Sequence, residues 1–505
     1  MFIALHVAVS ALLVALVYWH ISAYNTRNRY THIPSFPIPI SWKWIGGHLP
    51  LIAKRRRQLG GHRIKNFAMI LDWIRKDLDV NTMVLFVANR QMMYTIHVPI
   101  SAKVLSDHRT FMKPGARESK IAYVNGERVF GDHGIIMEPG TEVWYHKRKM
   151  MDPAFQKKYL KCLMEDMKTI TNKMCHVLEQ KTDQKIIDIY SLLNKVALEI
   201  ICTCGFSLRD DFVMLEESEL NKAVTDMLEI IPLSLRESLT FWMPWKFNQE
   251  KKRLKEANSL LRGTVRKILE ARIETHSENP DASPNDILGH IIRANMFSGN
   301  ISIEDLLDDF VVFLAAGMET TAITMSCLIW HILKQPEISQ KIVAEINEVY
   351  GGKEELEFED LNKLIYLEQC LKECLRLHPP IQLSFRRSPN RDVIVDHLLI
   401  PRETTIVMST EAIQQLETHW SNPDKFDPER FAPGKKIQPF TYSPFSAGPR
   451  QCIGKHFAIM EAKVVLAALF QKFQLYDPYP EETKLEKVTN MTCKPKDGVF
   501  IGIQQ

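Results

Sequence analysis

A ten-residue segment that delivers one cysteine to the start of a helix constrains this chain more than any other stretch. The segment Phe-Ser-Ala-Gly-Pro-Arg-Gln-Cys-Ile-Gly occupies residues 445–454, and strong helix formers with apolar residues at helical spacing follow it. The pattern predicts a helix that starts after Gly454 and close to Cys452. The unpaired N–H groups and the positive end of a helix dipole favour an anionic sulfur. The position therefore suits a thiolate ligand rather than an inert thiol.

The neighbours of this cysteine fit a flat ligand. Gly448 and Gly454 allow a tight turn and a close approach of the backbone. Arg450 is placed to pair with a carboxylate on such a ligand. An isolated buried cysteine is usually a small hydrophobic residue, but the ten positions of this segment agree with the other interpretation. We therefore interpret Cys452 as a ligand.

The pattern Phe-x-x-Gly-x-Arg-x-Cys-x-Gly resembles the haem-binding signature of the cytochrome P450 monooxygenases, and its fixed positions are Phe445, Gly448, Arg450, Cys452 and Gly454. The resemblance implies a haem b group whose iron takes Cys452 as its axial thiolate ligand, the ligation that favours cleavage of the O–O bond. It also implies that the other four residues help to bind the haem.

The fold is predicted to be mainly α with a small β region. Two apolar runs within residues 80–105 are typical of short strands, and helical patterns dominate afterwards, including a charged helix over 249–275. Residues 276–286, rich in Pro, Ser, Asn and Asp, predict a surface loop. The resemblance implies the P450 fold, as a single haem-thiolate catalytic domain over 46–505.

The N-terminal stretch predicts a membrane anchor. Residues 2–21 contain no Asp, Glu, Lys or Arg and are long enough to cross a bilayer as a helix. Arg27 and Arg29 follow, so the positive-inside rule places the rest of the chain in the cytosol. We predict a transmembrane anchor over 1–24 and a proline-containing hinge over 25–45; a cleaved signal peptide is the alternative. Similarity to microsomal P450s implies the endoplasmic reticulum membrane.

Composition excludes several other classes of protein. Lys and Arg together number 64 against 60 Asp and Glu, which gives no reason to expect a nucleic-acid partner. The nine cysteines are odd in number and lack the paired spacing of a zinc site, which favours a reducing compartment. Cys370 and Cys374 lie four residues apart on a predicted helix, and we interpret them as buried thiols.

A long apolar helix is predicted over 306–333, with a cap at Ser302 and acidic residues in its first turn. Gly317 and two threonines weaken it, since a glycine costs about 1 kcal/mol relative to alanine and threonine hydroxyls compete for backbone carbonyls. Small residues leave a groove for a small molecule. The segment Ala-Gly-Met-Glu-Thr-Thr resembles the oxygen-activation motif of the P450 family. The resemblance implies that Thr320 hydrogen-bonds the activated dioxygen and that Glu319 relays protons.

Further haem contacts follow from the resemblance. Trp144 and Arg148 lie four residues apart, on one face of a predicted helix. In the family a Trp-x-x-x-Arg helix holds a haem propionate, which implies that role for both residues. Arg386 is implied to contact another propionate, and the adjacent Arg387 remains an alternative.

A Glu-x-x-Arg pair, Glu373 and Arg376, is usually a surface pair when it stands alone. Together with the haem loop and Arg430 it resembles the structural triad of the P450 family. The implied role is to hold the core behind the haem, so these three residues are structural rather than catalytic.

Several segments resemble those of the cholesterol 24-hydroxylases, namely residues 29–34, 358–361, 366–367, 440–446 and 460–465. The regions expected to face substrate depart from that enzyme, most clearly at 381–384. The predicted reaction is side-chain hydroxylation of a sterol, with hydroxylation of a fatty acid or a xenobiotic as the alternative. A haem-thiolate peroxide isomerase and a non-catalytic haem protein are remoter alternatives, because the Glu319–Thr320 pair is retained.

The resemblance implies O₂ as co-substrate and electrons from NADPH through a membrane-bound flavoprotein reductase. A basic face that steers an acidic partner is predicted from seven lysines: Lys147, Lys149, Lys157, Lys158, Lys435, Lys436 and Lys455. The apolar stretch 239–245 is either part of the core or a second membrane contact near a substrate entrance.

Overall fold

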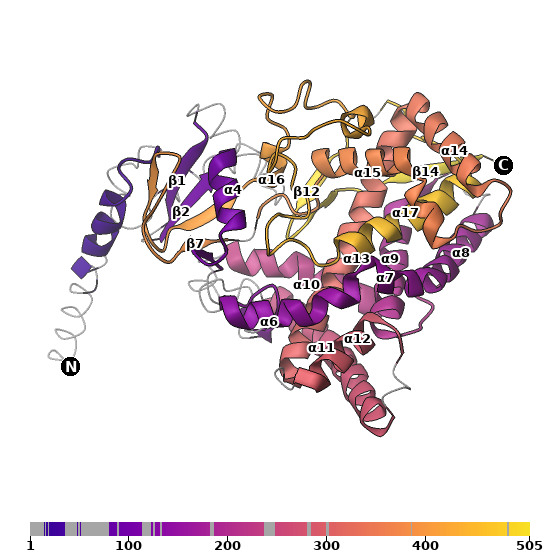
Figure 1. The fold of residues 1–505 in the computed structure, drawn as a ribbon, viewed down its shortest axis with the longest axis horizontal. Helices are drawn as coiled ribbons and strands as arrows, with labels where there is room; N and C mark the ends of the chain where they lie inside the picture. The colour runs from indigo at the N-terminus through magenta and orange to yellow at the C-terminus, as the bar shows by residue number, and fades with distance from the viewer. Residues whose placement is uncertain are drawn as a thin grey trace. The chain divides into compact units, whose positions relative to one another are not determined.

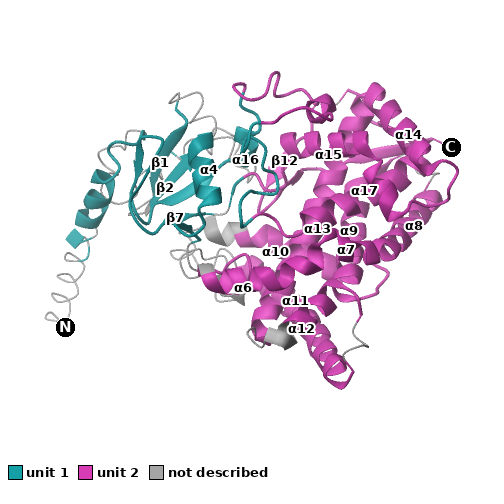
Figure 2. Ribbon diagram, in the orientation of Figure 1, with its two compact units in different colours: residues 1–114, 383–416, 438–450 teal, residues 115–382, 417–437, 451–505 magenta. Residues whose placement is uncertain are grey.

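The chain divides into two compact units. Residues 1–114, 383–416 and 438–450 form the first, and residues 115–382, 417–437 and 451–505 form the second (Figure 2). The computed structural model describes residues 15, 17, 18, 20–35, 48, 51, 80–87, 90–113, 123–124, 127–131, 134–181, 186–236, 248–279, 284–298, 302–384, 386–481 and 484–504. Most of the predicted anchor, part of the hinge and all of 239–245 lie outside these residues.

The first unit is built on a small sheet. Strands β1 (Thr82–Val87) and β2 (Arg90–Thr95) are antiparallel, and β10 (Thr405–Met408) joins β2 in parallel. The strands predicted within residues 80–105 are thereby confirmed. The remaining elements are α4 (Val98–Ser106), β3 (Phe111–Met112) with β7 (Ser388–Pro389), β8 (Val393–Val395) with β9 (Leu398–Ile400), and α16 (Thr410–Ile413).

The second unit is mostly helical (Figure 1). Its helices are α6 (Thr141–Met151), α7 (Lys157–Leu160), α8 (Met164–Gln180), α9 (Ile189–Phe206), α10 (Glu219–Arg236), α11 (Asn248–Glu278), α12 (Ile287–Ser298), α13 (Ile303–Lys334), α14 (Pro336–Tyr350), α15 (Ile365–Leu377) and α17 (Lys455–Lys472). Four short 3₁₀ helices accompany them within the described residues: η4 (Asp152–Phe155), η5 (Lys161–Leu163), η8 (Phe358–Asn362) and η9 (Pro428–Phe431).

Short strands complete the second unit. β14 (Phe500–Gln504) pairs with β11 (Gln474–Tyr476) and β6 (Ile187–Asp188), β12 (Lys487–Thr489) with β13 (Cys493–Pro495), and β4 (Tyr123–Val124) with β5 (Glu127–Arg128). The predicted fold class, mainly α with small sheets, is confirmed. The charged helix predicted over 249–275 is α11, which continues three residues into the predicted loop.

Helix α13 lies among the other helices of the second unit and begins as predicted (Figure 1). The Asp305 N–H donates to Ser302 Oγ at 3.1 Å, and the Ser302 N–H donates back to the Asp305 carboxylate at 3.4 Å. This reciprocal pair is a capping box, which satisfies N–H groups that a helix start leaves without partners.

Gly317 has a packing role that the sequence did not indicate. A Cβ atom at this position would lie 2.9 Å from Ile201 Cγ1 on α9. The glycine therefore lets α9 and α13 approach closely.

Two helices among the described residues, α9 and α13, are long and apolar enough to cross a membrane. However, 78% and 83% of their most apolar windows are buried within the protein. Burial of this extent is typical of core helices.

Buried thiols line the core, as predicted. Cys370 and Cys374 are buried, and Cys374 Sγ lies 3.5 Å from the Thr324 carbonyl oxygen. Burial raises the pKa of both thiols. Within the described part of the chain, no three His, Cys, Asp or Glu side chains gather as metal ligands.

Glu373 and Arg376 form a fully buried ion pair on α15. The Arg376 guanidinium donates two hydrogen bonds to the Glu373 carboxylate, at 2.7 and 2.8 Å, and both side chains are 0% exposed. Arg430 in η9 donates to the same carboxylate at 3.2 Å, and the Asp427 N–H donates to it at 2.8 Å. The structure thus brings together the three residues that the sequence predicted as a triad.

Candidate active site

The signature segment is shared between the two units, with 445–450 in the first and 451–454 in the second. In the second unit α17 begins at Lys455 with Gly454 as its N-cap, so the helix predicted after Cys452 is confirmed. Cys452 is exposed to solvent. Desolvation by surrounding protein atoms raises the pKa of its thiol overall, and the Gly454 N–H and the positive charges of Arg148 and Lys455 offset part of that rise. The local charges therefore favour the anionic sulfur that a metal ligand requires.

Helix α6 reaches the cysteine loop through Arg148. Its Nη1 donates to the Gln451 carbonyl oxygen at 2.7 Å, and its Nε donates to Asp152 Oδ1 at 2.5 Å. Trp144, one turn earlier on the same face, is 3% exposed and packs in the main core. The structure therefore brings Arg148 to the residue next to Cys452.

In the first unit, Gly448 has a positive φ of 71°, a conformation that favours glycine. A Cβ there would lie 2.2 Å from the Leu105 carbonyl oxygen, so the close approach that the sequence predicted is made to α4. Gly454, by contrast, would place a Cβ no closer than 4.0 Å, to the sulfur of Cys452. Phe445 is half-buried at the start of the segment.

Cations gather in the first unit near Arg450. Desolvation lowers the pKa of Lys113, and the positive charges of Arg387 and Arg450 lower it further. Arg387 is 5% exposed, and desolvation lowers its pKa to about 10. Burial raises the pKa of Tyr94, and the positive charge of Arg386 offsets part of that rise. A cluster of like positive charges favours the binding of an anion. The sequence did not indicate that Lys113 belongs to this cluster.

The open face of α13 consists of small residues. Ala316 is exposed and Thr320 is half-buried there, whereas Met318 and Glu319 are buried and Gly317 packs against α9. The Thr320 hydroxyl donates to the Ala316 carbonyl oxygen at 2.7 Å. Its lone pairs point away from that bond, so Thr320 can accept a hydrogen bond from a molecule at this face.

Glu319 lies on the covered side of α13 and is 2% exposed. Its carboxylate accepts a hydrogen bond from the Thr492 hydroxyl and pairs with Lys494 of β13 at 3.3 Å. Lys494 also pairs with Glu229 of α10, at 2.9 Å. Burial lowers the pKa of Lys494, but the two carboxylates raise it by more. The ion-pair chain therefore runs from buried Glu319 to the side chain of Glu229, which is 28% exposed.

Replacing Lys494 with methionine should destabilise the protein by about 3 to 5 kcal/mol, because it leaves a buried carboxylate without its cation. The free energy of unfolding from urea titrations measures this. A double variant with Glu319→Gln should recover part of the loss. Lys496→Met is the matched control, because Lys496 and Glu486 are 41% and 71% exposed and a surface pair contributes less than about 1 kcal/mol. Equal effects of the two methionine variants would contradict the buried pair.

Six of the seven lysines predicted to form a basic face, all except Lys147, are exposed. Lys147 is an exception and its assignment is corrected, since its side chain is 3% exposed and pairs with Asp309 at 2.9 Å. A lysine directed into the core cannot meet a partner protein.

Comparison with models of protein families identifies the family to which this chain belongs. The model of the family Cytochrome P450 matches residues 39–501. The chain belongs to the cytochrome P450 family. The P450 fold and the monooxygenase class predicted from the sequence are thus confirmed, and with them haem, O₂ and electrons delivered by a reductase.

Curated relatives span nearly the whole chain or most of it. Leukotriene-B4 omega-hydroxylase 3 of Mus musculus is 25% identical over 96% of this chain and 92% of its own length. Cytochrome P450 4d2 of Drosophila melanogaster is 28% identical over 74% and 77%, and taurochenodeoxycholic 6 alpha-hydroxylase of Sus scrofa is 26% identical over 74% and 75%. These relatives do not show the predicted similarity to cholesterol 24-hydroxylases.

The residues present fit a haem. Cys452 offers a sulfur whose neighbouring charges favour the thiolate, and the cations around Arg450 suit the two carboxylates that a haem carries. Cys452 belongs to the second unit, and the cations around Arg450 belong to the first.

Proposed function

We propose that this P450 hydroxylates a long-chain lipid that carries an acidic group. The observation that carries the proposal is the similarity to a leukotriene B4 ω-hydroxylase over 96% of the chain. Leukotriene B4 is a long-chain carboxylic acid, and the bile-acid hydroxylase among the relatives also takes its name from an anionic lipid. The fatty acid alternative from the sequence is thus better supported than the sterol.

In this proposal the haem supplies, when bound, the chemistry that inserts one oxygen atom of O₂ into a C–H bond. Cys452 Sγ would hold the iron. Arg450 and Trp144, with Arg148, would hold the haem carboxylates. Arg386 or Arg387 would supply a further contact, and of the two it is the charge of Arg387 that acts, with that of Arg450, on Lys113. Phe445, Gly448 and Gly454 shape the loop.

Protons reach the open face of α13 through two residues. Glu319 would relay protons from the solvent-accessible side, where its ion pair with Lys494 connects it to the partly exposed Glu229. Thr320 Oγ1 orients a donor at the open face by accepting its hydrogen bond. Because Glu319 and Thr320 face different sides of the helix, water would carry the proton between them.

Hydroxylation of a sterol side chain is the second candidate, and the segments that resemble cholesterol 24-hydroxylases favour it. Most of those segments belong to the framework rather than to the substrate-facing regions. They therefore reflect common descent more than specificity.

The two candidates are separated by supplying the protein, a P450 reductase and NADPH with an equimolar mixture of leukotriene B4, a long-chain fatty acid, its methyl ester and cholesterol. Mass spectrometry should find hydroxylated acids, with the ester turned over more slowly because it lacks the charge. A side-chain hydroxysterol as main product would overturn the first candidate in favour of the second.

Thr320→Ala should lower the amount of product formed per NADPH severalfold while NADPH oxidation continues, because alanine cannot accept a hydrogen bond at the open face. Product, NADPH and hydrogen peroxide are measured together. Thr321→Ala is the matched control, since the Thr321 hydroxyl makes the same kind of bond, to the Gly317 carbonyl at 3.1 Å, on the buried side. Fully coupled turnover by Thr320→Ala would remove Thr320 from the proton path.

We further propose that residues 1–24 anchor the enzyme in the endoplasmic reticulum membrane, with 25–45 as hinge and 46–505 as a catalytic domain in the cytosol. NADPH–cytochrome reductase would supply electrons at the exposed lysines. Resistance of the protein to extraction by alkaline carbonate tests the anchor. The salt dependence of the reduction rate in a Lys435→Glu, Lys436→Glu variant tests the docking face.

A further inference from the structure

Lys147 occupies an unusual place on α6. Trp144, Lys147, Arg148 and Met151 follow one another at helical spacing, and all but Arg148 are buried. This is the stripe that normally carries apolar residues. A lysine in the core is costly because its ammonium loses hydration. The role of Lys147 therefore depends on the residue with which it forms an ion pair.

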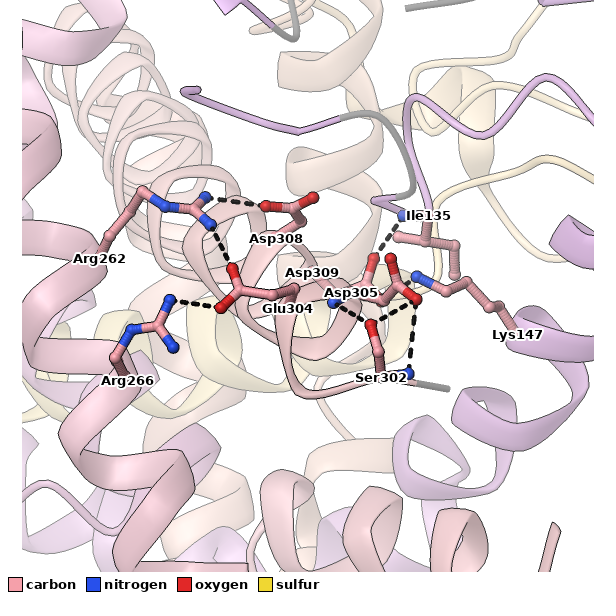
Figure 3. A network of polar contacts seen from close by, with 9 residues as sticks. All are labelled: Ile135, Lys147, Arg262, Arg266, Ser302, Glu304, Asp305, Asp308 and Asp309. Atoms are coloured by element: carbon pink, nitrogen blue, oxygen red, sulfur yellow. Dashed lines mark hydrogen bonds and ion pairs between the residues drawn. The ribbon is translucent and has the colours of Figure 1, made fainter. Parts of the chain in front are cut away.

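That partner is Asp309 on α13, whose side chain is 0% exposed. Lys147 Nζ donates to Asp309 Oδ2 at 2.9 Å, and the Ile135 N–H donates to Oδ1 (Figure 3). Both carboxylate oxygens are therefore engaged, one by α6 and one by the loop before it. The pair ties α6 directly to α13.

The preceding residue faces the opposite way. Asp308 is also 0% exposed, and it accepts a hydrogen bond from Arg262 Nη1 of α11 at 2.8 Å (Figure 3). A Cβ at Gly131 would lie 1.6 Å from Asp308 Oδ2, and its φ of 66° also favours glycine. The start of α13 is thus held on one side by α11 and on the other by α6.

The tie to α6 leads to the cysteine loop. Arg148 is the residue after Lys147, and it donates to the Gln451 carbonyl oxygen, next to Cys452, at 2.7 Å. A shift of α6 would move both side chains together. A continuous path therefore runs from Asp309 through Lys147 and Arg148 to Cys452.

We propose that Lys147 and Asp309 are positioning residues for the iron ligand: their buried ion pair fixes α6 so that Arg148 reaches the Cys452 loop. The inference rests on Cys452 as the iron ligand within the proposed function. The absorption band of the ferrous carbon monoxide complex tests that premise separately in the unmodified protein, because it distinguishes thiolate from thiol ligation whatever the substrate.

The pair should respond to mild acid. Burial raises the pKa of Asp309 to about 6, against the lowering effects of Lys147 and the Ile135 N–H, and the negative charge of Asp308 raises it further. The folded state thus binds this proton more tightly than the unfolded state. Through this carboxyl, protonation below about pH 6 stabilises the folded state, although it also breaks the ion pair with Lys147. A loss of thiolate ligation near that pH is therefore a local change and not global unfolding.

The experiment compares Lys147→Met and Asp309→Asn with Arg262→Met after reduction with dithionite and exposure to carbon monoxide. The first two variants should lose most of the thiolate-type band in favour of the thiol-type band at neutral pH. Arg262→Met also leaves a buried aspartate without its cation, but on the α11 side, so it should keep the thiolate-type band. Lys147→Arg should keep it as well, because the positive charge remains.

Thiolate-type bands in Lys147→Met and Asp309→Asn as strong as in Arg262→Met would overturn the proposal. If neither variant folds, the unmodified protein and Lys147→Arg are titrated instead. A reversible loss of the thiolate-type band in the unmodified protein, centred near pH 6, supports the proposal. Retention of that band well below pH 6 overturns it.

Discussion

Cys452→Ser is expected to abolish hydroxylation, lowering product formation by several orders of magnitude. A serine hydroxyl stays protonated near neutral pH and cannot replace the anionic sulfur that we propose as the iron ligand, so the variant would lose the electron donation that favours O–O cleavage. The charges that favour the thiolate, from Arg148, Lys455 and the Gly454 N–H, cannot compensate for this. The ferrous carbon monoxide spectrum and the rate of product formation measure the two effects.

Cys162→Ser provides the control. Cys162 lies in η5 of the same unit, and among the cysteines that the structure describes it shares exposure to solvent only with Cys452. Its replacement should leave spectrum and turnover unchanged, which separates loss of the ligand from general thiol chemistry. A thiolate-type spectrum in Cys452→Ser would identify another cysteine as the ligand.

Local pattern predicted the elements around these residues well. Ser302 and Asp305 lie three positions apart, and their reciprocal hydrogen bonds begin α13 as the spacing indicated. The helix after Cys452 was equally predictable, because helix formers with regular apolar spacing follow Gly454. These features depend on contacts within a few residues, which a sequence displays directly.

Partners that lie far apart in the chain were not predictable in this way. Lys147 and Asp309 are 162 residues apart, and Glu319 and Lys494 are 175 apart. In the sequence each lysine looks like an ordinary solvated side chain, which is why Lys147 was assigned to a docking face. Only the fold shows that its helix turns this position inward.

The same reasoning applies to Gly317. Its place in a motif suggested a groove for a ligand, but a Cβ atom added there would lie 2.9 Å from Ile201 on another helix. A glycine in a helix has at least two physical explanations, open space or close packing, and the sequence does not distinguish them. Substrate preference is harder still, because an apolar pocket discriminates by only about 1 to 3 kcal/mol per methylene.

Glu373→Ala is expected to destabilise the protein by about 3 to 5 kcal/mol or more, because it leaves the fully buried Arg376 guanidinium without its carboxylate. Arg430 and the Asp427 N–H lose the same acceptor. Against a total stability of about 5 to 15 kcal/mol, this loss should prevent most of the holoprotein from accumulating. The free energy of unfolding from urea titrations, together with haem content per polypeptide, measures the effect.

Glu359→Ala is the matched control, because Glu359 pairs with Lys161 at the surface, where the two side chains are 62% and 57% exposed. That variant should lose less than about 1 kcal/mol. Glu373→Gln should fall between the two, since its amide oxygen still accepts a hydrogen bond but no longer offsets the two guanidinium charges. If Glu373→Ala were as stable as Glu359→Ala, the buried network would be a consequence of the fold rather than one of its supports, and the packing of α15 against η9 would have to hold this region alone.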